Sequence, residues 1–139
     1  FNIGFQFFVK PFVLDRISHH HDADEYLIFL GGTFPNLFDF DAEIEFTIGK
    51  IGVDAEVYHI TKPTIIRIPA GVEHCPLIFK RVDKPVFFQA ALMQDMFSHI
   101  YTTEDGGTKE LWYNGPLPCK LDSKKKCDCC RNCIEREWR

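Results

Sequence analysis

Apolar and polar residues alternate along most of this chain in short runs. The clearest run extends from Glu43 to Gly49, where glutamate and threonine are interleaved with isoleucine and phenylalanine. A period of two places neighbouring side chains on opposite faces of a strand, so this run predicts a half-buried β-strand. Further strands are predicted at residues 5–9, 12–17, 25–30, 56–60, 64–68, 74–82 and 86–93. Strands that recur every eight to twelve residues, with turn residues between them, predict an all-β sandwich or barrel.

The predicted strand at residues 25–30 is largely apolar on both faces. Glu25, Leu27 and Phe29 share one face, and Tyr26, Ile28 and Leu30 share the other. A strand of this kind is covered on both sides. We therefore expect the barrel interior on one side and a second sheet or subunit on the other, which predicts a homodimer.

The pattern changes near residue 95. Residues 102–108 are polar and rich in glycine, and residues 120–126 are mostly charged. We therefore predict a β-barrel over residues 1–94 and a C-terminal extension over 95–139, which forms a tail or packs as an irregular segment.

Composition narrows the function classes. The formal net charge of −4 and pI near 5.8 argue against a nucleic-acid partner, because nothing would neutralise phosphate. No apolar run is long enough to span a membrane, and no signal peptide is visible. These features and the cysteine content favour the cytoplasm. The chain begins at Phe1 without a methionine, so we consider a trimmed chain or a fragment.

One cluster of histidines contains candidate metal ligands. His19 and His21 are two residues apart and leave the same face of an extended segment, whereas His20 points the other way. A turn at residues 22–24 would bring Glu25 beside them, and a tight turn at 69–73 would deliver His74. Three imidazoles and a carboxylate suit a divalent transition metal. A solvated histidine-rich turn is the alternative, but it leaves His74 unexplained.

The order of these residues resembles the two sequence motifs of the cupin superfamily. The first motif is matched by His19, His21, Glu25 and Gly32, and the second by Pro69, Gly71 and His74. The chain departs from the family pattern at three turn and packing positions, which are Val13, Pro63 and Ile78. The resemblance covers residues 5–93 and implies an antiparallel β-barrel of jelly-roll type with the metal inside it.

The resemblance also implies open coordination positions, which distinguish a catalytic metal from a structural one. Iron, manganese, nickel, cobalt and zinc all suit this ligand set. Cupins of this pattern include dioxygenases, isomerases, lyases and proteins that only bind, so the expected function is metal-dependent chemistry on a small polar organic molecule. The alternatives are a non-catalytic sensor or binding protein, and one half of a two-cupin protein.

Four other polar residues are weaker candidates for a role in the cavity. They are Tyr26, Tyr58, Gln89 and Arg67. The tyrosines and Gln89 could act on a substrate, with Tyr26 and Gln89 as the catalytic candidates, and Arg67 could hold an anion. For Gln89 an exposed edge position explains the residue equally well, whereas such tyrosines are more often core residues and an arginine on a strand more often points outward. His59 and His99 show no partner pattern.

The C-terminal tail contains a cysteine cluster. Cys119, Cys127, Cys130 and Cys133 have spacings that predict a second, structural zinc site. An iron–sulfur cluster, disulfide bonds and a disordered reduced tail are the alternatives. Cys75 follows His74 directly and is expected to lie in the core.

Overall fold

The computed structural model describes residues 1–113, and every regular element in this range is a β-strand. The strands are β1 (Asn2–Phe8), β2 (Phe12–Asp15), β3 (Glu25–Gly31), β4 (Ala42–Ile48), β5 (Glu56–Ile60), β6 (Thr64–Ile68), β7 (His74–Val82), β8 (Val86–Leu92), β9 (Phe97–Thr102) and β10 (Thr108–Tyr113). No helix in residues 1–113 has the length and hydropathy needed to cross a membrane.

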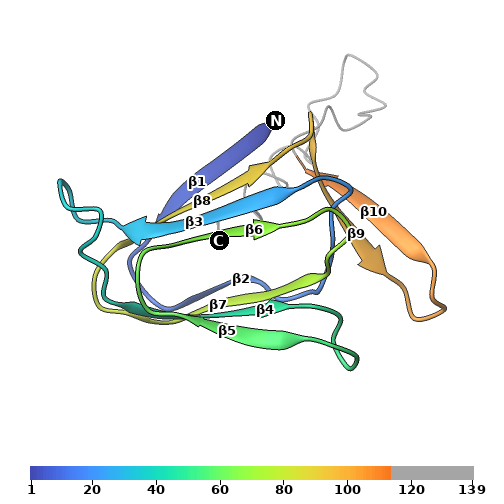
Figure 1. The fold of residues 1–139 in the computed structure, drawn as a ribbon, viewed down its shortest axis with the longest axis horizontal. Helices are drawn as coiled ribbons and strands as arrows, with labels where there is room; N and C mark the ends of the chain where they lie inside the picture. The colour runs from blue at the N-terminus through green and yellow to red at the C-terminus, as the bar shows by residue number, and fades with distance from the viewer. Residues whose placement is uncertain (114–139) are drawn as a thin grey trace, which may run out of the picture.

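The first eight strands form two facing antiparallel sheets with the orders β1-β8-β3-β6 and β2-β7-β4-β5 (Figure 1). Strand β1 pairs with β8, β2 with β7, β3 with β6 and β4 with β5, and successive pairs alternate between the two sheets. A long antiparallel ribbon that is rolled up in this way is a jelly roll. The predicted fold class is therefore confirmed.

Phenylalanines fill the space between the sheets. Phe8 and Phe79 stack with ring centroids 3.9 Å apart, and Phe29 and Phe88 lie 5.1 Å apart. These four rings come from four strands and are at most 6% exposed. Aromatic side chains bury large areas, so this cluster anchors the two sheets to each other.

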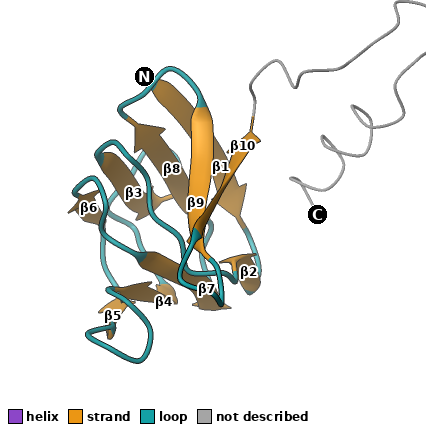
Figure 2. Cartoon of the chain, turned by 90° about the vertical axis from the view of Figure 1, so that its right-hand side faces the viewer, coloured by secondary structure: helices purple, strands orange, loops and turns teal. Residues whose placement is uncertain are grey.

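The predicted strands match β1 to β8 with shifts of a few residues at their ends, but one element was missed. Residues 97–113 form a β-hairpin, β9–β10, where the sequence predicts a tail or an irregular segment. The hairpin lies across the open end between the two sheets (Figure 2). Two backbone hydrogen bonds between His20 and Ile100 attach it there, at N···O distances of 3.0 and 2.9 Å. This long-range pairing has no local signature in the sequence.

The outer face of the first sheet remains partly exposed. Phe5 and Phe7 on β1 are 63% and 57% exposed, and the outward side chains of β3, such as Ile28, are half-buried. A second subunit over this face stays a prediction. The division of the chain at residue 94 also stays a prediction, and the cysteine cluster at 119–133 lies outside the described residues.

Candidate metal centre

Strands β3 and β7 begin with the two ligand candidates Glu25 and His74, at the end of the barrel that the hairpin covers. The segment before β3 runs beside the start of β7. Backbone hydrogen bonds join His19 and His74 in both directions, at 3.0 and 2.9 Å, and Gly71 N–H donates to the His21 carbonyl at 2.8 Å. The two motifs are therefore fastened to each other through the backbone.

Asp24 fixes the turn that precedes Glu25. Its carboxylate accepts hydrogen bonds from Arg67 Nε at 2.8 Å and from Ala70 N–H at 3.0 Å. Its carbonyl accepts from Met93 N–H at 2.9 Å. Arg67, a candidate anion-binding residue, is 57% exposed and forms an ion pair with Asp24 outside the cavity.

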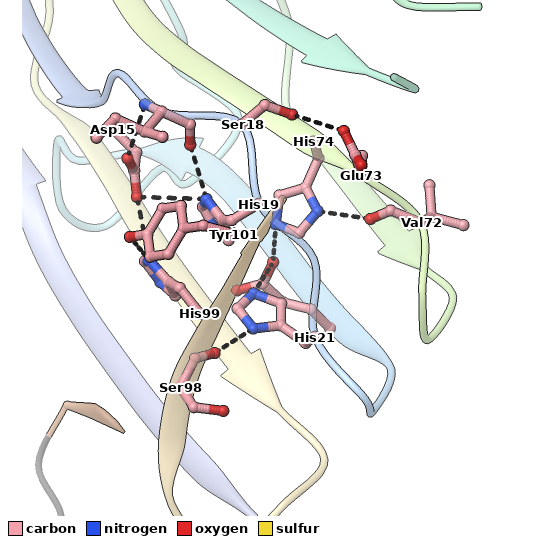
Figure 3. Close-up of polar contacts among 12 residues, drawn as sticks. Asp15, Ser18, His19, His21, Val72, Glu73, His74, Ser98, His99 and Tyr101 are labelled. Atoms are coloured by element: carbon pink, nitrogen blue, oxygen red, sulfur yellow. Dashed lines mark hydrogen bonds and ion pairs between the residues drawn. The ribbon is translucent and has the colours of Figure 1, made fainter. Parts of the chain in front are cut away.

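Three histidine side chains, those of His19, His21 and His74, converge inside this end of the barrel (Figure 3). One ring nitrogen from each of His19, His21 and His74 lies within 4.8 Å of the others, and all three histidines are buried. Glu25 Oε2 lies 3.2 Å from His74 Nε2 and 3.6 Å from His21 Nε2. Ligand atoms about 2.1 Å from a shared ion stand roughly 3.0–3.4 Å apart, so the separation of Glu25 from His74 suits a shared metal ion and that from His21 is slightly longer.

Hydrogen bonds orient each of the three rings. The Nδ1 atoms of His19 and His74 donate to the carbonyls of Ile17 and Val72, both at 2.9 Å, and His21 Nδ1 donates to the Ser98 carbonyl at 2.5 Å. A carbonyl only accepts, so Nδ1 carries the proton and Nε2 is left with its lone pair. The Nε2 atoms of His21 and His74 are buried without a hydrogen-bond partner among the described residues. A metal ion would satisfy these atoms, and metal-binding histidines are commonly held in this way.

The protonation states also suit a metal. Burial lowers the pKa of His19 to about 3, with a further contribution from His74. Burial raises the pKa of Glu25, but its contacts with His21 and His74 together outweigh burial and lower that pKa to about 2. The neutral imidazole of His19 and the ionised carboxylate of Glu25 are the forms that bind metal ions.

The structure adds residues that the sequence analysis missed. His99 on β9 stacks on His19 with ring centroids 3.7 Å apart. Its Nδ1 lies 2.9 Å from the Tyr101 hydroxyl and 3.6 Å from Asp15 Oδ2. Asp15, His19 and His99 form a second group whose ligand-type atoms lie within 4.8 Å of one another. Burial lowers the pKa of His99 to about 2 and raises that of Asp15.

The remaining candidates lie elsewhere. Tyr26 and Gln89, the proposed catalytic residues, occupy half-buried outward positions of β3 and β8 and do not line the cavity at the histidines. Tyr58 is 46% exposed on β5 and donates to Glu56, and His59 beside it is also exposed. Cys75 is buried in the core, and burial raises its pKa well above the usual value.

No protein-family model and no curated protein matches this chain. Among solved structures, it is similar to the capsular polysaccharide assembling protein CapF from Staphylococcus aureus, at 11% identity and a TM-score of 0.47 over 68% of this chain and 24% of that one. It is also similar to vicilin from Solanum lycopersicum (tomato), at 13% identity and a TM-score of 0.43 over 96% of this chain and 32% of that one. The chain thus spans less than a third of either protein. The jelly-roll assignment rests on the strand order of this chain, and its chemistry on its own residues.

Proposed function

We propose that this chain is a cupin-type protein that binds a divalent transition metal through His19, His21, Glu25 and His74 and uses it on a small organic molecule. The observation that carries the proposal is the pair of buried Nε2 atoms, on His21 and His74, that face Glu25 without a hydrogen-bond partner among the described residues. Leaving such groups unsatisfied is costly, so a ligand for them is expected.

The bound metal would supply a Lewis acid that polarises an oxygen of the substrate. The chain contributes the surroundings of that oxygen. His19, Glu25, His74 and His99 line a cavity of about 520 Å³, which gives a substrate access to the site. The Tyr101 hydroxyl lies 2.9 Å from His99 Nδ1, so this pair could hold a proton, or pass one between the two atoms, beside the proposed metal ligands. This arrangement supports a dioxygenase, isomerase or lyase type of reaction.

A non-catalytic binding protein is the second candidate. It is favoured by the mutual pairing of His99, Tyr101 and Asp15, since groups that hold one another in place also serve a purely structural role. Turnover separates the two candidates. Metal-loaded protein is screened with enediols, hydroxy acids and keto acids, with and without oxygen. A non-catalytic binding protein converts none of these compounds to product.

Elemental analysis tests the metal site itself. We expect about one transition metal per chain in the wild type, its loss in His74→Ala, and its retention in His59→Ala, the matched control at an exposed histidine. A chain that ends at Asn114 should also keep the metal, because it retains all four proposed ligands. A metal that leaves with the tail and is unaffected by His74→Ala would overturn the proposal.

A further inference from the structure

The cavity beside the proposed metal site differs in character between its two parts. Most of its ionisable side chains gather around the histidines, where His19, His99 and Asp15 contact one another. Away from this cluster the walls are mostly apolar and come from β2, β3, β7 and β8. The volume of about 520 Å³ falls within the range of ligand pockets, which is about 300–1,000 Å³.

The apolar walls begin directly beyond the ligand candidates. On β3 the next inward residue after Glu25 is Leu27, and on β7 the cavity-lining residue that follows His74 and Cys75 is Leu77. Leu27 pairs with Ala90 across the sheet, and Phe88, two residues before Ala90 on β8, lies further from Glu25. All of these residues line the cavity. Two residues of a strand span roughly 6.6 Å, so the apolar section, from the level of Leu27 and Ala90 to that of Phe88, is about that long.

Charged groups for an anionic or sugar-like substrate are scarce in this section. Arg16 is the cationic side chain besides the histidines among the described lining residues, and it is exposed. Asn2 and Gln6 supply two amides on the β1 side. A molecule with many hydroxyls would leave most of them without partners against the apolar walls, which costs free energy.

We infer that the ligand of this site has a compact, metal-chelating oxygen head and an apolar body about 6 Å long, such as a short alkyl chain or a single ring. This inference rests on the proposed function, because it assigns the oxygen head to the metal. It narrows the expected small polar molecule to a class that is polar only at the head.

Two hydroxamates with the same head test this inference. Full-length protein loaded with zinc is titrated calorimetrically with acetohydroxamate and with hexanohydroxamate, which carries four more methylenes. His74→Ala serves as the blank for zinc held elsewhere. Burial of a methylene tightens binding roughly fourfold, so four more methylenes should make hexanohydroxamate bind roughly 250-fold more tightly.

A substitution that fills the cavity locates the binding site of the alkyl chain. Gly4 lines the cavity, pairs with Ala90, and would accept a Cβ with no atom within 4 Å. Gly4→Val therefore fits the strand and should lower the preference for hexanohydroxamate at least tenfold, leaving acetohydroxamate unchanged. Ile3→Val, on the outer face of the same strand, is the matched control and should change neither affinity.

The outcomes separate the two ideas. Equal affinities for the two hydroxamates, or a preference that survives Gly4→Val, would overturn the inference while the metal site stands. If the barrel holds zinc and binds neither hydroxamate, the inference is overturned. If the barrel holds no zinc, the proposed function is overturned and the inference with it.

Discussion

Removal of the β9–β10 hairpin should weaken metal binding although it removes none of the four proposed ligands. The experiment compares a chain truncated after Gln94, which lacks the hairpin, with a chain truncated after Asn114, which retains it. The hairpin supplies the Ser98 carbonyl that accepts from His21 Nδ1 at 2.5 Å. Loss of such an outer partner lowers metal affinity about 10–100-fold, which is about 1.4–2.7 kcal/mol.

The same truncation should lower stability by an amount that leaves the barrel folded. It removes two backbone hydrogen bonds between His20 and Ile100 and exposes the surfaces that the Ile100 side chain, 7% exposed, now covers. At about 1 kcal/mol for each hydrogen bond and about 2 kcal/mol for the side chain, the free energy of unfolding falls by roughly 4 kcal/mol. Typical domains have about 5–15 kcal/mol, so measurements at low temperature are appropriate.

Competition with a chromogenic chelator at low temperature gives the metal affinity, and circular dichroism confirms that the barrel is folded. Ile100→Ala in the chain that ends at Asn114 is the milder variant, and we expect it to weaken both stability and metal affinity by smaller amounts. A folded chain ending at Gln94 that binds metal within twofold of the longer chain would refute the role assigned to the hairpin. So would an Ile100→Ala variant that is destabilised yet binds metal unchanged.

Three further predictions concern the scaffold. Phe79→Ala should lower the free energy of unfolding by about 4 kcal/mol in urea titrations, because the ring is 1% exposed, whereas Phe38→Ala, at a 79% exposed ring, should change it by less than about 0.5 kcal/mol. The hydrogen bond from Arg67 lowers the pKa of Asp24 below its unfolded value of about 3.9. The ionised carboxylate of Asp24 therefore stabilises the fold fully above that pH, and this stabilisation is lost as the pH falls through the folded pKa. The difference in urea midpoint between wild type and Asp24→Asn should accordingly shrink between pH 5 and pH 2.5. Finally, we propose that a second copy of the chain covers the outer face of β1. The exposed rings of Phe5 and Phe7 present about 200 Å² there, and each partner of a stable dimer buries roughly 800 Å². Phe5→Lys combined with Phe7→Lys should then halve the mass measured by light scattering, and a wild-type monomer would contradict this proposal.

The strands and the shared face of His19 and His21 could be predicted because both depend on local pattern, whereas the place of His74 beside them was implied by the family resemblance. A period of two identifies the strands, and it places His19 and His21 on one face. The same rule also predicts which way the Tyr26 side chain points. Since Glu25, Leu27 and Phe29 face inward, Tyr26 must face outward, and the structure places it there. For Gln89 the local sequence does not predict the direction of the side chain, because that direction depends on the pairing of Gln89 with Ile28.

His99 could not be predicted in the same way. Its place in the site depends on the pairing of Ile100 with His20, eighty residues earlier in the chain. The residues Phe97, His99 and Tyr101 do alternate and all line the cavity, which is the signal a strand prediction at 97–102 would have used. The polar, glycine-rich residues that follow this segment obscured that alternation, and they form the turn of the hairpin.

The groups that orient the three histidines are all peptide carbonyls, and two of them belong to the residue two positions before the histidine, Ile17 for His19 and Val72 for His74. Every amino acid carries a carbonyl, so substitutions at these two positions leave the acceptors in place. The orientation of these rings is therefore robust to sequence drift, and an alanine scan would not detect it. Replacing the peptide groups by esters, which weakens the carbonyl as an acceptor, would reveal it. His21 is different, because its carbonyl comes from β9, and through it metal affinity can respond to whatever displaces the hairpin.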